Sequence, residues 1–436
     1  MFAGFAEVDI TPPVGSLLDG FIARTSPSTG VDAPLSARAL WLEDGDGTGL
    51  VIGLDVLGLA PGTADRLARR LADGAGIPED RILLSCTHTH SGPMTVRVRG
   101  IGDADEIYVR FLEERVADAA ARAFSARRVV KVAWGTAPVS ISVNRRRRVP
   151  GEAGVVLGPN PDGPTDPAVR VMHLRGADSS IILFHHACHP YCLGADWSLI
   201  SPDFWGHAAA ELKRQGHDSI YLNGCSGNIE SVGAFGGPDA ARTVGRQLAQ
   251  AVLDACRQAH WEENTSLRAG SRRFAIPHEP LPPLEEVEQA VDRADRTVRD
   301  DERTNPLVRD RIRAAWSEWL RELKQAAGAS GDLPALAARV SIIRVGCGVI
   351  VALPGEVFYE IGRRIAGRIE ADPVCVAAYC HGYIGYVPTP DAYAEGGYEV
   401  DDSHRYVGLW RISREAGTVL ENQVIELWRE FGGQVR

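Results

Sequence analysis

Short apolar runs alternate with amphipathic, helix-like segments along almost the whole chain, and this alternation favours an α/β architecture. The apolar runs have the length of buried strands, and they predict strands over residues 50–57, 82–86, 129–134, 181–184, 219–222, 349–353 and 374–379. Between them, apolar residues recur at helical spacing, which predicts helices over residues 63–73, 106–124, 204–215, 240–257 and 357–369. The pattern therefore predicts a mixed β-sheet core flanked by helices.

Two segments depart from this alternation. Residues 284–328 are highly charged and lack strand signals, and we interpret them as a helical hairpin that is a lid, an inserted subdomain or a solvated decoration. Residues 149–167 are rich in glycine and proline, which predicts a long loop. Because no internal repeat or low-complexity linker divides the chain, we expect one domain over residues 1–436, with 284–328 as an insertion or lid within it.

Composition narrows the class of protein. The 436 residues are 44% hydrophobic and 24% charged, as in ordinary globular proteins. The formal net charge of −10 argues against binding to nucleic acid or to anionic lipid. No uncharged apolar stretch approaches the roughly 18 residues of a membrane span, and the first residues lack the pattern of a signal peptide. We therefore expect a cytoplasmic protein without stable membrane association, and a homo-oligomer is compatible with the sequence.

Candidate chemistry lies where predicted strands end, and the strongest motif follows the strand over residues 82–86. This motif is Thr87-His88-Thr89-His90-Ser91-Gly92-Pro93. Because strand side chains alternate between faces, we expect His88 and His90 to project to the same side. Two such imidazoles bind a metal together, or one binds it while the other moves protons. Among common metals, zinc suits neutral imidazole best.

Later strand ends carry further ligand-type residues, namely His189, Glu230, Glu356 and Tyr386. Ligands of open α/β sheets bind beyond the carboxyl ends of the strands, so these residues describe one shared site. Each also has a structural explanation, such as a hydrogen-bonded loop histidine, a carboxylate at a helix N-terminus or a packed aromatic ring. Their repeated placement after strands favours a metal site. A thiolate zinc site at Cys188 and Cys192 ranks lower, because no second cysteine pair has ligand spacing.

Four groups of residues together carry a family resemblance. They are the opening Ala6-Glu7-Val8-Asp9-Ile10-Thr11-Pro12, the motif over residues 87–93, Leu353-Pro354-Gly355-Glu356 with Gly362-Arg363-Arg364 after it, and the tyrosines Tyr383, Tyr386, Tyr393 and Tyr398. In order and spacing, these groups resemble the catalytic domain of the neutral/alkaline non-lysosomal ceramidases. The expected fold is therefore α/β, with a mixed β-sheet core flanked by helices, ceramidase-catalytic-domain-like, with a helical insertion.

The resemblance implies a zinc ion (Zn2+) held by two histidines, one glutamate and one tyrosine, which fall on His88, His189, Glu356 and Tyr386. It also implies a second histidine beside the metal, a substrate-facing arginine and a further tyrosine, which fall on His90, Arg145 and Tyr398. Bound zinc lowers the pKa of water to about 7 and polarises a carbonyl, as amide hydrolysis requires. We expect His90 to act as general base, while Arg145 and Tyr398 stabilise the oxyanion or anchor the substrate.

The chain departs from the family pattern in one loop. Family members commonly have Gly-Asp-Val-Ser-Pro there, whereas this chain has Gly227-Asn228-Ile229-Glu230-Ser231, so Glu230 takes the position of a serine implicated in catalysis. Glu230 is then a general base, an anchor for the substrate amine or a structural substitution. We also expect neither the signal peptide nor the C-terminal immunoglobulin-like domain of secreted members, since the chain ends 38 residues after Tyr398. Both expectations favour a substrate other than ceramide.

The sequence thus predicts a zinc-dependent hydrolase that cleaves an N-acyl amide bond in a small soluble molecule by means of zinc-activated water. The same site also suits an ester or lactone hydrolase, or an enzyme that forms amides by the reverse route. An alternative from a different functional class is a protein without catalytic activity that binds a metal or a ligand in a degenerate site.

Overall fold

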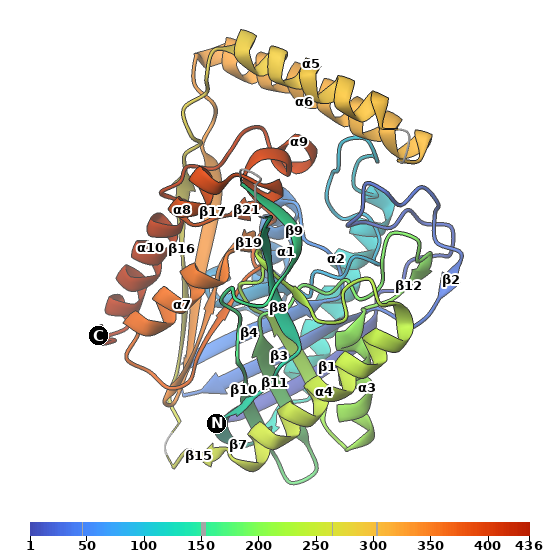
Figure 1. Ribbon diagram of the computed structural model, residues 1–436. Coiled ribbons are helices and arrows are strands. Elements are labelled where there is room, and N and C mark those ends of the chain that lie inside the picture. The colour runs from blue at the N-terminus through green and yellow to red at the C-terminus, as the bar shows by residue number, and fades with distance from the viewer. Residues whose placement is uncertain (46, 150–153, 264, 302–303) are drawn as a thin grey trace.

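The computed structural model describes residues 1–45, 47–149, 154–263, 265–301 and 304–436, and it has the expected α/β architecture. In this part of the chain, three large β-sheets follow one another in sequence, and helices pack against them (Figure 1). Antiparallel pairs predominate, but each large sheet contains one parallel pair. The sheets are therefore mixed, as the sequence predicts.

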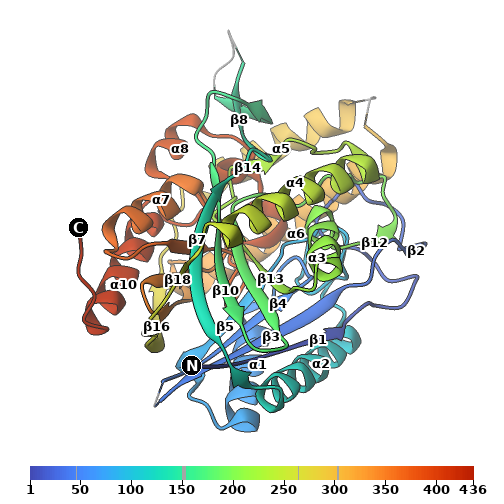
Figure 2. The same cartoon turned by 90° about the horizontal axis from the view of Figure 1, so that it is seen from below.

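The first sheet is built from the N-terminal segment. Its strands lie in the order β5 (Ile82–Cys86), β4 (Gly47–Leu54), β3 (Ser36–Asp44), β1 (Phe2–Asp9) and β6 (Arg128–Val129). Helix α2 (Glu106–Ser125) packs on β1 and β3, while α1 (Pro61–Ala75) and the short helix η1 (Glu79–Arg81) lead into β5 (Figure 2). Every residue of β5 is buried, which explains its unbroken apolar run.

The second and third sheets carry the remaining long strands. The second has the order β13 (Asp218–Asn223), β11 (Ser180–His186), β10 (Ala168–Arg175), β7 (Lys131–Pro138) and β15 (His260–Trp261), and it contacts α3 (Phe204–Arg214) and α4 (Gly237–Arg257). The third has the order β16 (Leu267–Ile276), β17 (Leu336–Val345), β18 (Gly348–Ala352) and β20 (Val374–Ala377), and it contacts α7 (Tyr359–Arg368) and α10 (Ala416–Glu430).

Shorter elements surround the ends of these sheets. Strand β2 (Gly30–Val31) pairs with β12 (Leu199–Ile200), β8 (Ser142–Arg148) lies between β14 (Ile229–Ser231) and β9 (Val155–Asn160), and β19 (Glu356–Val357) pairs with β21 (Tyr386–Val387). Helix α8 (Pro390–Glu395), the π-helical turn η2 (Tyr398–Asp402) and α9 (His404–Val407) follow β21. Helices α5 (Leu284–Asp300) and α6 (Pro306–Ser330) pack on each other as a hairpin at one end of the molecule, and α6 also contacts α9 (Figure 1).

Most predicted elements coincide with observed ones, and two predictions need correction. The segment over residues 149–167 is not a loop throughout, because β9 (Val155–Asn160) pairs antiparallel with β8; residues 150–153 lie outside the described part. Here, pairing with a neighbouring strand outweighs the local glycine and proline signal. The strand predicted over 129–134 is divided between β6 and β7, which belong to different sheets.

Direct contacts between the sheets bring the carboxyl ends of several strands together. Ser85 in β5 forms an isolated bridge with Cys380, which follows β20. Gly224, which follows β13, bridges to Ala377 at the end of β20. The first, second and third sheets therefore meet at the ends of β5, β13 and β20, and the candidate residues lie in the turns beyond these ends.

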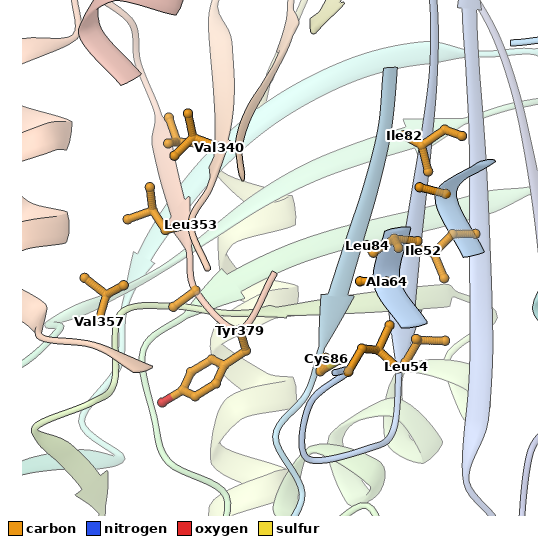
Figure 3. Close-up of a cluster of buried hydrophobic side chains, with 14 of the residues drawn as sticks. Ile52, Leu54, Ala64, Ile82, Leu84, Cys86, Val340, Leu353, Val357 and Tyr379 are labelled. Carbon is orange, nitrogen blue, oxygen red and sulfur yellow. The ribbon is translucent and has the colours of Figure 1, made fainter. Parts of the chain in front are cut away.

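The hydrophobic core beneath these turns joins the first and third sheets. Figure 3 shows Ile52, Leu54 and Leu84 on one side, Val340 and Leu353 on the other, with the Tyr379 ring in the same cluster. All of these side chains are buried. The ends of the strands are thus fixed by packing, which gives the turns above them a rigid base.

This packing predicts the cost of a core cavity. Leu84 is 1% exposed and pairs with Ile52 across β4 and β5, so Leu84→Ala should lower the free energy of unfolding by about 2–5 kcal/mol. The matched control is Val129→Ala, because Val129 is 66% exposed and its truncation should change stability by less than about 0.5 kcal/mol. Urea unfolding followed by tryptophan fluorescence measures both, and equal losses would contradict the prediction.

Candidate metal centre and active site

His88 and His90 lie in the turn that follows β5, not on the strand itself. The turn is held to the end of β4 by hydrogen bonds from Thr87 N to Leu54 O (2.8 Å) and from His88 N to Val56 O (3.0 Å). His88 has a left-handed backbone, with φ of 67°. The two imidazoles do face the same point, but a left-handed turn brings them there rather than the alternation of a strand. Such a conformation in a non-glycine residue is uncommon and is kept only where the surroundings enforce it.

Two of the histidines are oriented by backbone carbonyls. His88 Nδ1 lies 2.8 Å from Leu57 O, and His189 Nδ1 lies 3.2 Å from Ser226 O. A carbonyl accepts hydrogen bonds only, so each Nδ1 carries a proton, and the neutral form of each ring then presents the lone pair of Nε2. Metal-ligating histidines characteristically use one ring nitrogen in this way while the other faces the ion.

The Nε2 atoms of three histidines converge on one point. His88 and His189 are 3.1 Å apart at Nε2, His90 and His189 are 3.1 Å apart, and His88 and His90 are 3.3 Å apart. All three side chains are buried, and they form a group able to hold a metal ion. Burial and the neighbouring charges lower the pKa of His90 and His189 well below the ordinary value, which keeps both imidazoles neutral.

Glu356 adds a carboxylate to the same cluster. It lies on β19, 2% exposed, with Oε2 at 3.2 Å from His88 Nε2 and 3.7 Å from His189 Nε2. The Tyr383 hydroxyl donates to Oε1 at 2.6 Å, whereas Oε2 has no hydrogen-bond donor among the described residues. Burial alone would raise the pKa of Glu356, but His88, the Tyr383 hydroxyl and Arg145 together hold it below the ordinary value. Glu356 is therefore an ionised, buried carboxylate with one oxygen open toward the imidazoles.

This donor set fits a zinc ion. Tetrahedral ligands at ordinary zinc distances are separated by about 3.4 Å from one another. The separations within the cluster run from 3.1 to 3.7 Å, and they form two triangles that share the His88–His189 edge. Glu356 completes one triangle and His90 completes the other. Converging lone pairs and an unpaired carboxylate oxygen repel each other unless a cation lies among them.

Arg145 joins the cluster to the tyrosines. It lies on β8 at 3% exposure, and its donors are used within the protein: Nε donates to Glu399 Oε1 (3.0 Å), Nη1 to Tyr191 OH (3.2 Å), and Nη2 to Gly227 O (2.7 Å) and Tyr386 OH (3.0 Å). Nη1 also lies 3.5 Å from His189 Nδ1. The guanidinium thus fixes the positions of several residues around the cluster.

Tyr386 and Tyr398 lie on the side of the cluster where β21 pairs with β19. The backbone register places Tyr386 opposite Glu356, and the Tyr386 and Tyr398 rings are 5.9 Å apart in an edge-on arrangement. Burial raises the pKa of both phenols above the ordinary value, although Arg145 acts in the opposite direction on each. Both hydroxyls are therefore protonated in the absence of a cation. A cavity of about 240 Å³ adjoins Tyr386, lined in part by Tyr383, Tyr386, Tyr393, Glu399 and Trp410.

Glu230 lies on β14, where its backbone forms a bridge with His189. Its Oε2 accepts a hydrogen bond from Tyr191 OH at 2.9 Å. Burial raises the pKa of Glu230, while the hydrogen bond and Arg145 act against that rise. The fold therefore brings Glu230 to the same region as the histidines, at the position where the sequence departs from the family pattern.

All eight predicted site residues belong to one connected network, although their roles stay predictions. The metal-ligand candidates His88, His189 and Glu356 meet directly, together with His90. Arg145 connects the other three: it donates to Tyr386, whose ring lies against Tyr398, and it reaches Glu230 through the Tyr191 hydroxyl. Cys188 and Cys192 are not in the histidine group, and burial raises the pKa of both thiols. Their surroundings disfavour the thiolates that a zinc site needs.

Sequence reasoning missed the contribution of the N-terminal loop. The Phe21 ring lies 4.8 Å from the His90 ring, and Arg24 Nη1 donates to His90 O and to Asp19 O. Asp19 is fully buried, and burial raises its pKa to about 7. Gly20 lies so close to His90 that a Cβ there would be 2.5 Å from His90 Cγ. Polar residues in a loop give no sequence signal for such contacts, which exist only because the loop folds over the site.

None of the described helices is both long and apolar enough to cross a membrane.

Comparisons with known proteins identify the fold. No protein-family model matches the sequence, and a search of curated proteins finds no match. The structure is similar to that of neutral ceramidase from Pseudomonas aeruginosa, with a TM-score of 0.69 and 17% identity over 98% of this chain and 74% of the other. It is also similar to a ceramidase complexed with C2, with a TM-score of 0.70 and 16% identity over 98% of this chain and 75% of the other. The chain therefore has a neutral ceramidase-like fold.

Proposed function

We propose that this protein is a zinc-dependent hydrolase that cleaves the amide bond of an N-acyl small molecule. The observation that carries the proposal is the convergence of the Nε2 atoms of three buried histidines, with an unpaired oxygen of the buried Glu356 carboxylate beside two of them. Such a donor set, in which the far ring nitrogens of His88 and His189 are fixed by carbonyls, is typical of a zinc site. The likeness to ceramidases, which are named for an N-acyl amide, supports amide hydrolysis as the reaction.

The chain's own residues suit the steps of amide hydrolysis. His88, His189 and Glu356, with Tyr386 as a fourth ligand, would hold zinc, which supplies a polarising charge and lowers the pKa of water to about 7. His90 is neutral and presents Nε2 to the cluster, so it is able to accept a proton as general base. Arg145 donates to the Tyr386 hydroxyl oxygen, and its positive charge favours the phenolate that metal ligation requires. Tyr398 is then the protonated phenol available to a developing oxyanion.

Metal analysis and a substrate panel test the proposal. The purified protein should contain about one zinc per chain, lose N-acyl amide hydrolysis when a chelator removes the metal, and regain it when zinc is added back. The panel should include esters and lactones, because cleavage of these alone would replace the amidase with an esterase or lactonase. His260→Ala is the surface control, since His260 is exposed on β15 and should keep zinc and activity. Zinc bound without turnover on any acyl substrate would indicate a binding protein instead.

The close approach of Gly20 to His90 gives a sharper prediction. Gly20→Ala should lower amide hydrolysis at least about tenfold, because the added methyl must displace the His90 ring that serves as general base. Gly15→Ala is the matched control: Gly15 has nearly the same backbone φ (101° against 96°), but no described atom lies within 4 Å of the place that its methyl group would take. Both variants therefore carry similar backbone strain, of about 1–2 kcal/mol, and only Gly20→Ala disturbs the site. Comparable activity in the two variants would contradict the assignment of His90.

A further inference from the structure

Glu230 is a buried carboxylate that has no ion pair with any described residue. It is 5% exposed, and within the described part of the chain its donor is the neutral Tyr191 hydroxyl, which binds Oε2. Arg145 donates to that hydroxyl and acts on Glu230 itself only at longer range, and the Arg145 charge is already balanced by Glu399 at 3.0 Å. A buried anion without a cation is costly, so the remaining oxygen of Glu230 is suited to a positively charged ligand.

Three aromatic rings form a group around Tyr191, whose hydroxyl binds this carboxylate. Tyr191 is stacked on Phe235 at 5.1 Å, and Phe21 lies 6.3 Å from Tyr191 and 6.1 Å from Phe235. Phe235 is 63% exposed and has a left-handed backbone, with φ of 57°, held by a hydrogen bond from its N–H to Tyr191 O. Phe235 therefore brings this group of rings to the surface of the protein. The faces of such rings attract cations.

The same rings adjoin the histidine cluster. Tyr191 lies 4.8 Å from the His189 ring and 5.4 Å from the His90 ring, and Phe21 lies 4.8 Å from the His90 ring. Strand β14 carries Glu230 and the following turn carries Phe235, so one short segment supplies both the charge and an aromatic wall. The rings and Glu230 are therefore close enough to the cluster to contact the amine half of a substrate whose amide lies there.

We propose that the amine half of the substrate carries an ammonium group, which Glu230 binds while Phe21, Tyr191 and Phe235 form an aromatic wall around it. Glu230 is thus a specificity-determining residue rather than a base. The proposal rests on the proposed amide hydrolysis for the identity of the scissile bond, but binding of a cation to this pocket stands independently of it. Aromatic faces together with one carboxylate are the usual chemistry of organic-ammonium recognition.

Matched substrates test the selectivity. N-hexanoyl-1,4-diaminobutane and N-hexanoyl-4-aminobutanol differ only in a terminal ammonium or hydroxyl group. The zinc-loaded wild-type enzyme should favour the ammonium substrate by about 10- to 100-fold in kcat/KM, mainly through KM. Glu230→Gln should remove this preference by lowering kcat/KM for the ammonium substrate about 10- to 100-fold more than for the hydroxyl substrate. Glu263→Gln, at an exposed carboxylate, should keep the preference.

A binding measurement separates this inference from the reaction. Benzyltrimethylammonium has no lone pair for a metal, and calorimetry should show that it binds wild type roughly tenfold or more tightly than Glu230→Gln. Binding of this probe without any amide cleavage would overturn the proposed function and leave the cation pocket standing. Amide cleavage without any preference for the ammonium substrate in wild type would overturn the pocket and leave the function standing. Because the wild-type comparison needs no variant, a Glu230→Gln protein that fails to fold does not remove the test.

Discussion

Replacing His189 with alanine is expected to remove the bound zinc and to lower amide hydrolysis more than about 1,000-fold, because the ion contributes several kcal/mol to the reaction. The same outcome is expected for His88→Ala. These two residues share the edge between the two donor triangles, so the ion needs both of them whether Glu356 or His90 completes the set. Zinc content by mass spectrometry and initial rates on an N-acyl amide measure the effect.

His90→Ala distinguishes the two triangles. If Glu356 is the third ligand, His90→Ala should keep zinc near one per chain and lose about 100- to 10,000-fold in rate, as expected for removal of a general base. If His90 is the third ligand, both zinc and activity should fall. His173→Ala is the buried control, because His173 is 5% exposed and its Nε2 contacts the Ser180 hydroxyl at 2.8 Å, away from the cluster. Equal zinc content in wild type and His189→Ala would contradict the metal site altogether.

The candidate site could be predicted from sequence because its residues lie directly after buried strands. The apolar run over residues 82–86 predicts β5 at its observed bounds, and parallel strands end at the same edge of a sheet. The alternation of strand side chains is nevertheless the wrong reason for the convergence of His88 and His90. A left-handed backbone at His88 and a carbonyl at Leu57 O aim the imidazole, and neither feature has a sequence signal.

What the sequence does not predict depends on contacts between distant segments. Strand β3 carries a buried arginine, Arg38, which is neutralised by Asp55 at 2.9 Å and Glu7 at 2.7 Å from other parts of the chain. A charged residue within an apolar run weakens the strand pattern, although the folded partners make it compatible with burial. Likewise, Phe21 and Gly20 approach His90 only after the N-terminal loop folds over the site. Local periodicity carries no information about such pairs.

The buried ion pair beneath the tyrosines leads to the second large effect, which concerns stability and activity together. Glu399 accepts from Arg145 Nε at 3.0 Å and from Arg146 Nη1 at 2.8 Å, and all three side chains are buried. Glu399→Gln should lower the free energy of unfolding by about 3–5 kcal/mol, because it leaves the Arg145 guanidinium without a carboxylate partner. Arg146 is affected less, since it also pairs with Glu395 at 3.3 Å.

The uncompensated charge should also weaken zinc binding, because Arg145 Nη1 lies 3.5 Å from His189 Nδ1 and would add a positive charge beside the ion. Glu395→Gln is the matched control: Glu395 pairs with Arg146 and with the exposed Arg148, and loss of such partly exposed pairs should cost no more than about 1 kcal/mol.

Removing both members of the pair separates structure from function. Arg145→Met combined with Glu399→Gln should be more stable than Glu399→Gln alone, because the buried charge that lacks a partner is gone. The double variant should nevertheless stay poorly active, since it loses the guanidinium that donates to the Tyr386 hydroxyl and holds Tyr191. Urea unfolding and amide hydrolysis, measured on the same preparations, test both statements. Recovery of both activity and stability in the double variant would mean that Arg145 serves folding alone. A double variant as unstable as Glu399→Gln would mean that the stability loss comes from packing rather than from the unpaired charge.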